Sequence, residues 1–298
     1  MRITNTVFLF LVFFLLFSCR TRNAQKPEAS EPQLITRSYA VSVGDSFTIY
    51  VSLPQGYDGR EPTKYPVVYL TDANFSFEMT AGVFRSYAAV GLIPQVILVG
   101  IGYRNIEEMD SLRDRDYTYP AALPEYEMQP SGGAERFLGF ISGALIPEIE
   151  GAYHCDTAHR ILMGHSLGGY FVVYALLQQL VKQHHCFSGF IAASPSLYYN
   201  HYYLLQQISA LPLAKLHAGK LRLYITYGGF EDEEEADQPD IEPNKKTIAR
   251  LSALFDSGKQ GAVGLKIETF SNLAHMDMPI PSYLRGLPIV LDIGKPSQ

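Results

Sequence analysis

A serine stands at the centre of a glycine-flanked segment, GHSLG at 164–168, which matches the pattern G-x-S-x-G. The four residues from Ile161 predict a short buried strand before it, and an apolar repeat of helical spacing begins at Leu167. A serine on so sharp a strand-to-helix turn has a strained backbone, and the turn closes only around small residues. Such a turn exposes the hydroxyl of Ser166 as a nucleophile and directs the backbone N–H of Leu167 at a developing oxyanion.

The general base for this hydroxyl is expected among the eight histidines. The serine hydroxyl becomes a good nucleophile only when a neighbouring base removes its proton, and an acid must orient that base. In proteins with this type of turn, the three residues follow one another along the chain in the order Ser, acid, His. His275 directly follows the last predicted strand, in a loop that would project over the carboxyl edge of a sheet. The other histidines precede Ser166, end the helix after the turn on the opposite edge, or lie on or near helices. We therefore predict His275 as the base.

The acid is expected in the acidic loop that follows a strand predicted at 221–227. Glu231 is the first carboxylate on this loop and has the shortest reach to His275, so we predict it as the third member of a triad. Asp232 and Asp237 remain alternatives. The rest of this acidic run is expected to face solvent.

A second oxyanion donor is expected from a backbone N–H in the loop after the strand predicted at 67–70. We predict Ala73 as this donor. Since a main-chain donor requires no particular side chain, Asp72 and Asn74 remain neighbouring alternatives. The chain contains no H-E-x-x-H or C-x-x-C pattern, and its acidic run lacks the spacing of a calcium-binding loop. No metal ion and no cofactor are therefore expected.

Strands and helices that would position these groups alternate from residue 67 onward. They predict one doubly wound, mostly parallel α/β sheet, preceded by two antiparallel strands within 34–53. Ligands of such sheets bind at the carboxyl ends of the strands. Residues 103–134 are expected to form a long irregular insert, either a rim that faces the substrate or a solvated loop. Strands are expected at 67–70, 95–101, 190–194, 221–227 and 265–270, and helices at about 78–90, 135–153, 167 onward, 200–210 and 244–255.

The N-terminal segment is typical of an exported protein. Arg2 precedes an apolar run at 7–17, and Cys19 follows where cleavage is expected, which resembles the lipobox of bacterial lipoproteins. We predict a signal peptide at 1–18, a lipid anchor on Cys19, a flexible tether at 19–33 and a catalytic domain at 34–298 that faces the periplasm or cell surface. An ordinary secretory signal with an incidental cysteine is the alternative.

The composition narrows the class of partner. The formal net charge of −6 argues against nucleic acid and against a polybasic membrane patch, so a small-molecule substrate is expected, with the membrane contacted through the anchor alone. Cys155 and Cys186 could form a disulfide in an oxidising compartment or remain free thiols. The sequence leaves this pairing and the oligomeric state open.

Seven segments of the chain, spread between about 34 and 291, resemble the esterase family of α/β-hydrolases that includes esterase D-like enzymes and ferric-siderophore (enterochelin) esterases. The resemblance implies an α/β-hydrolase fold and ester hydrolysis through an acyl-enzyme, with Ser166 as nucleophile, His275 as base and an acid at Glu231. Ala73 departs from the family, whose members commonly carry glycine there. The matching segments are 67–75, 113–120, 132–141, 163–171, 192–199, 227–231 and 275–287.

Three functions fit this resemblance. The first is a carboxylesterase that acts on siderophore esters or on acylated carbohydrates. The others are an acyltransferase on the same scaffold and a non-catalytic binding protein that retains the fold. A siderophore substrate would favour basic and aromatic groups at the mouth of the site, such as Arg113, Arg115 and Tyr117, although these residues could instead form structural ion pairs.

Overall fold

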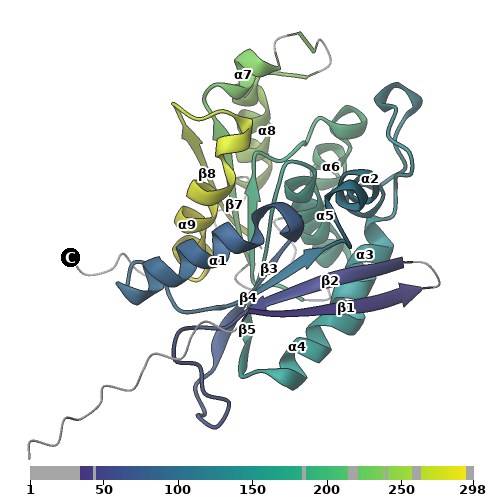
Figure 1. Ribbon diagram of the computed structural model, residues 1–298. Helices are drawn as coiled ribbons and strands as arrows, with labels where there is room; N and C mark the ends of the chain where they lie inside the picture. The colour runs from purple at the N-terminus through teal and green to yellow at the C-terminus, as the bar shows by residue number, and fades with distance from the viewer. Residues whose placement is uncertain are drawn as a thin grey trace, which may run out of the picture.

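An eight-stranded sheet forms the centre of the protein in a computed structural model (Figure 1). The structure describes residues 34–42, 45–182, 186–213, 221–235, 237–238, 241–256 and 263–292. The predicted signal peptide, the tether and the anchor residue Cys19 lie outside these described residues.

The strands of the sheet run in the order β1-β2-β4-β3-β5-β6-β7-β8. The first two strands form an antiparallel hairpin, β2 also pairs antiparallel with β4, and all remaining neighbours are parallel. This confirms the predicted mostly parallel sheet with an antiparallel start. The bounds are β1 (Leu34–Ser42), β2 (Asp45–Ser52), β3 (Tyr65–Leu70), β4 (Ile97–Gly102), β5 (Cys155–His165), β6 (Gly189–Ala193), β7 (Leu221–Gly228) and β8 (Val263–Phe270).

Helices cover both faces of the sheet (Figure 1). One face is packed by α1 and α9, and the other by a layer that includes α5 and α8. The α-helices are α1 (Ala73–Ala89), α2 (Ile106–Tyr117), α3 (Ala134–Phe140), α4 (Ile146–Ala152), α5 (Leu167–Lys182), α6 (Tyr199–Ser209), α7 (Glu231–Glu234), α8 (Asn244–Asp256) and α9 (Pro279–Val290). Short 3₁₀ turns lie at Pro124–Tyr126 and His275–Asp277, and a π-helical turn joins α3 to α4 at Ile141–Leu145.

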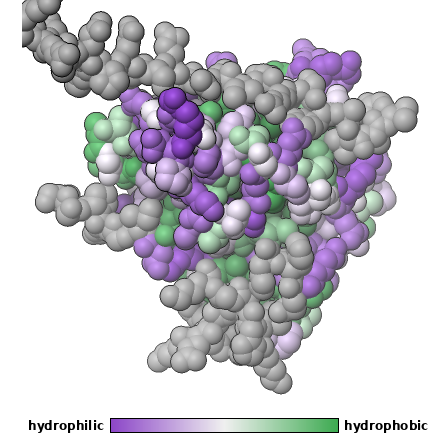
Figure 2. Space-filling view, turned by 90° about the horizontal axis from the view of Figure 1, so that it is seen from below, coloured by the Kyte–Doolittle hydropathy of each residue, from purple (hydrophilic) through white to green (hydrophobic). Residues whose placement is uncertain are grey.

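Alternate residues of the central strands enter two separate cores. In β3, Val67 and Tyr69 pack with α5, whereas Val68 and Leu70 pack with α1 and α9, and all four side chains are fully buried. Because both faces of the sheet are covered, these strands are continuous apolar runs in the sequence. On the face drawn in Figure 2, the described residues form a surface that mixes hydrophilic with hydrophobic areas. None of the described helices combines the length and the apolar character needed to cross a bilayer.

Two predictions of secondary structure were wrong. The helix expected from about residue 78 begins at Ala73, so the loop after β3 is only two residues long. The insert at 103–134 is not wholly irregular, because α2 occupies Ile106–Tyr117. The side chain of Asn105 accepts a hydrogen bond from the N–H of Glu108 (2.8 Å) and caps the start of α2, where acidic residues are also favourable.

The sequence analysis also missed α9, which lies across β6 and β7 and is apolar on its inner side. A Cβ atom added to Gly286 would lie 2.6 Å from Cδ1 of Tyr224 and 3.0 Å from Cδ1 of Ile191. The absence of a side chain at Gly286 therefore sets how closely this helix approaches the sheet.

We predict that Gly286→Ala lowers the free energy of unfolding by about 2 kcal/mol, because the added methyl forces α9 away from β7. The matched control is Gly139→Ala on α3, where an added Cβ meets no atom within 4 Å. There the better helix propensity of alanine should leave stability unchanged or raise it by up to about 1 kcal/mol. Urea denaturation measures both variants, and equal effects would contradict the close packing at Gly286.

Candidate active site

Ser166 lies on a tight turn between β5 and α5 with φ of +58°, a conformation that side-chain-bearing residues adopt rarely. Its N–H donates to the carbonyl oxygen of Ala193 (3.0 Å). A Cβ atom on Gly164 would lie 2.5 Å from the backbone of Gly168, and one on Gly168 would overlap Oγ1 of Thr71. Both glycines are therefore required for the backbone to close around the serine.

The predicted oxyanion donors both lie at helix N-termini. Leu167 is the first residue of α5 and Ala73 the first of α1, and neither N–H has an acceptor within its own helix. The two-residue loop before Ala73 packs against the serine turn, since a Cβ atom on either Gly164 or Gly168 would overlap Oγ1 of Thr71. The positive ends of two helix dipoles therefore point at the same edge of the sheet, where negative charge is favoured.

Glu231 begins α7 directly beyond β7 and is only 2% exposed. Its Oε1 accepts hydrogen bonds from the hydroxyl of Ser194 and from the N–H of Gly228 (2.5 Å). Burial by itself raises the pKa of Glu231, but His275 and these two donors outweigh it and hold the pKa below its usual value. The buried carboxyl group is therefore kept ionised.

His275 opens a 3₁₀ turn after β8, and its Nδ1 lies 3.7 Å from Oε2 of Glu231. This separation is longer than a hydrogen bond, as is common in active sites without substrate. The N–H of His275 donates to Oε2 of Glu234 (2.9 Å), which ties the histidine segment to the start of α7. Of the three predicted acids, the structure thus brings Glu231 to the histidine. Asp232 and Asp237 are exposed, and the side chain of Asp232 accepts a hydrogen bond from the N–H of Asn244 (2.7 Å).

Sequence reasoning missed His165, which precedes the serine. Its Nε2 donates to the carbonyl oxygen of His275 (2.8 Å), and the two rings lie 4.6 Å apart between centroids. Burial and the neighbouring His275 lower the pKa of His165 to about 3. His165 is therefore neutral at physiological pH and holds the backbone of the histidine segment beside Ser166.

Two further serines were also missed. Ser196 places its Oγ 3.3 Å from Oγ of Ser166 and donates its N–H to the carbonyl oxygen of Ser166 (3.2 Å). Ser194, with φ of +41°, bonds Glu231 as described above. Both follow the carboxyl end of β6, so the predicted edge of the sheet was a signal that could have identified them.

A cavity of about 400 Å³ opens beside Ser166 and His275. Its size is typical of a site for a small molecule. Arg113 reaches it from α2 and forms a bidentate ion pair with Asp72, with both contacts at 3.0 Å. Arg115 instead pairs with the buried Asp116, and Tyr117 lies in the core, so neither lines the mouth. The cavity is lined by Asp72, Phe75, Ser76, Ile106, Met109, Asp110, Arg113, His165, Ser166, His275, Met276, Pro279 and Tyr283.

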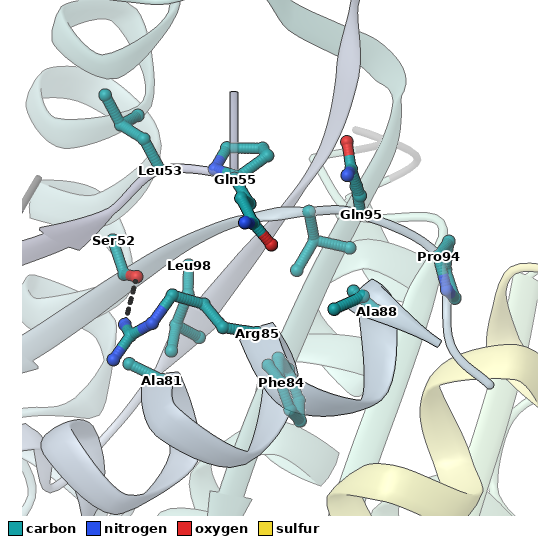
Figure 3. A pocket seen from close by; sticks show the side chains of 13 residues that line it. Ser52, Leu53, Gln55, Ala81, Phe84, Arg85, Ala88, Pro94, Gln95 and Leu98 are labelled. Atoms are coloured by element: carbon teal, nitrogen blue, oxygen red, sulfur yellow. Dashed lines mark hydrogen bonds between the residues drawn. The ribbon is translucent and has the colours of Figure 1, made fainter. Parts of the chain in front are cut away.

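Other cavities lie away from Ser166 and His275. Figure 3 shows one between the end of β2 and the C-terminal half of α1, where Arg85 donates to the hydroxyl of Ser52 (3.0 Å). It encloses about 20 Å³, room for about one water molecule. Among the described residues, no group of three histidine, cysteine or acidic side chains is arranged to hold a metal ion, and no disulfide joins Cys155 to Cys186.

Comparison with known proteins identifies the family of this chain. Residues 40–257 match the model of the family described as "Putative esterase". The chain belongs to this esterase family. It is 36% identical over 225 residues to the ferri-bacillibactin esterase BesA of Bacillus subtilis. The aligned region covers 72% of this chain and 75% of the relative. It is 29% identical over 220 residues to the siderophore triacetylfusarinine C esterase of Aspergillus fumigatus, with coverage of 70% and 73%.

Solved structures agree with this assignment at the level of the fold. The siderophore hydrolase EstB from Aspergillus nidulans superposes on this esterase with a TM-score of 0.71 and 22% identity, over 90% of this chain and 99% of that chain. The predicted α/β-hydrolase fold is thereby confirmed. The protein is an ester hydrolase.

The low pKa of His165 generates a prediction about stability. An unfolded histidine binds a proton below about pH 6.5 whereas His165 in the folded protein does not, so the free energy of unfolding falls as the pH is lowered below that value. His165→Gln keeps an N–H donor for the carbonyl of His275 but cannot titrate. Urea denaturation at pH 7.5 and 5 should show a smaller loss for this variant than for the wild type.

The control is His201→Gln, because His201 is exposed and pairs with Glu125 at the surface. It should keep the pH dependence of the wild type. A loss of stability in His165→Gln as large as that of the wild type would show that His165 is not held neutral.

The ion pair between Arg113 and Asp72 generates a second prediction. Asp72 adjoins Ala73, so removing its partner leaves a negative charge close to the oxyanion position. Arg113→Gln should therefore lower kcat for 4-nitrophenyl acetate by about tenfold. Adding Asp72→Asn should recover most of the loss, since asparagine tolerates the left-handed backbone of that residue (φ 52°). A double variant no faster than Arg113→Gln would contradict this electrostatic account.

Proposed function

We propose that this esterase hydrolyses siderophore esters through an acyl-enzyme formed on Ser166, with His275 as general base and Glu231 as the acid that orients it. One observation carries the proposal. A buried, ionised carboxylate faces the histidine that lines the same cavity as a serine held on a strained turn. The siderophore substrate is supported by the names of the two relatives reported above.

The first half of the reaction forms the acyl-enzyme. As Oγ of Ser166 attacks the ester carbonyl carbon, His275 takes the hydroxyl proton and becomes an imidazolium that the carboxylate of Glu231 stabilises. The carbonyl oxygen acquires negative charge, which the N–H groups of Leu167 and Ala73 stabilise by hydrogen bonds. When the C–O bond of the ester breaks, His275 returns the proton to the departing alcohol.

The second half releases the acid. Water replaces the alcohol, gives a proton to His275 and attacks the acyl carbon, and the second tetrahedral species then expels Oγ of Ser166, which regains its proton. Since Ser196 places its hydroxyl beside Ser166, it supplies a hydrogen-bond partner for the nucleophile between turnovers.

We infer that residues 1–18 direct export and that Cys19 carries a lipid anchor, with the tether at 19–33 holding the catalytic domain outside the cytoplasm. The positively charged start, the short apolar run and the cysteine at its end support this.

Substitution of the triad tests the mechanism. Ser166→Ala should lower kcat for 4-nitrophenyl acetate by about 10⁴-fold or more, and Glu231→Gln by about 10²–10⁴-fold because the histidine loses its ionised partner. The matched control is Asp232→Asn, a neighbouring exposed carboxylate whose amide can still accept from Asn244. It should stay within about threefold of the wild type.

Mass spectrometry of the products formed from siderophore esters tests the substrate. Hydrolysis that disappears in Ser166→Ala supports the proposal. A folded Ser166→Ala protein with near-wild-type hydrolysis would contradict the mechanism. Transfer of the acyl group to an added alcohol in preference to water would instead identify an acyltransferase.

A further inference from the structure

Three large apolar side chains surround the mouth of the cavity at Ser166, and each comes from a different element. Phe75 on α1, Ile106 on α2 and Met276 in the turn after β8 are 52%, 45% and 59% exposed. Exposed apolar side chains are common singly, but here three of them line one cavity, and we call these three side chains the apolar rim. Binding a ligand that covers this rim would remove apolar surface from water and contribute favourable free energy.

The ionisable groups that line the cavity do not favour an anion. They include the carboxylates of Asp72 and Asp110 and the guanidinium of Arg113. Arg113 directs two of its nitrogens to the carboxylate of Asp72, so its positive charge is already balanced. The charge of Asp110 then remains, and His165 adds none because it is held neutral.

Acidic groups continue beside the histidine. Glu231 and Glu234 lie against His275 from α7, one at its ring and the other at its backbone N–H. Neither glutamate lines the cavity, and Ser194 and Gly228 already bond Glu231, so the lining carboxylate of Asp110 is the fixed charge that an anionic substrate would approach. An uncharged substrate would meet no such penalty.

We propose that this cavity selects uncharged esters with an apolar group over polyanionic ones. The inference rests on the proposed function, and among siderophores it favours esters of neutral ferric tris-hydroxamate complexes over those of ferric tris-catecholate complexes, which are trianions. The apolar rim supplies the attraction and the carboxylate of Asp110 supplies the discrimination.

Two pairs of substrates test the selection with the full chain. In the first pair, 4-nitrophenyl butyrate is uncharged and 4-nitrophenyl hemisuccinate carries a carboxylate at a similar chain length. We expect kcat/KM to be about tenfold or more higher for the butyrate, with a ratio that narrows as salt is added. In the second pair, the ester of a ferric tris-hydroxamate should be hydrolysed faster than that of a ferric tris-catecholate.

Substitution of Asp110 tests the origin of the discrimination. Asp110→Asn should reduce the preference for the butyrate by about threefold to tenfold, mainly by raising kcat/KM for the hemisuccinate. The matched control is Glu61→Gln, which makes the same change of charge at an exposed position in the loop between β2 and β3, on the opposite edge of the sheet. It should keep the wild-type ratio.

Substitution of Phe75 tests the rim. Phe75→Ala removes an exposed side chain, so the fold should be retained, as circular dichroism would verify. We expect kcat/KM to fall about tenfold for 4-nitrophenyl hexanoate and clearly less for the acetate, because the longer acyl chain covers more of the rim.

Equal or faster hydrolysis of the anionic member of either pair by the wild type would overturn the proposal. So would an unchanged substrate ratio in Asp110→Asn, or equal losses for the two esters in Phe75→Ala. The proposed function fails separately, if Ser166→Ala continues to hydrolyse the uncharged ester at the wild-type rate.

Discussion

The site depends on the close approach of three backbone segments around Ser166. Gly164 and Gly168 leave no space for a methyl group between the serine turn and Thr71, and the N–H of Ser166 is fixed to Ala193 on the neighbouring strand. This packing maintains a left-handed serine backbone that would otherwise relax. It also brings the loop before α1 against the start of α5, so the contacts that strain Ser166 are also the ones that would position the two proposed oxyanion donors.

Charge at the site is arranged by burial and by hydrogen bonds together. Glu231 is ionised although buried, because Ser194, Gly228 and His275 stabilise the carboxylate. His165 is neutral, because burial and the neighbouring His275 disfavour its charge more than its hydrogen bond to the carbonyl oxygen of His275 favours it. His275 therefore lies between an ionised carboxylate, Glu231, and an uncharged histidine, His165. Because His165 stays neutral, it does not oppose a positive charge on His275.

The chain order and the ends of strands were enough to predict Ser166, His275 and Glu231 as neighbours, because parallel strands deliver their loops to one edge. Ser194 and Ser196 follow the carboxyl end of β6 but were not identified, because the left-handed backbone with which Ser194 bonds Glu231 leaves no pattern in the sequence. Helix α2 was missed because its sequence is mostly charged and only one side is buried. Helix α9 was hidden by Pro279, Pro281 and Pro288, although proline is tolerated in a first helical turn.

The central claim is that one hydroxyl among the serines of the chain is activated by one histidine. Diisopropyl fluorophosphate reacts with such serines, and mass spectrometry of digested protein locates the adduct. The account predicts a single modified peptide that contains Ser166, formed much more slowly in His275→Ala. A principal adduct on another serine, or an undiminished rate of modification in His275→Ala, would contradict it.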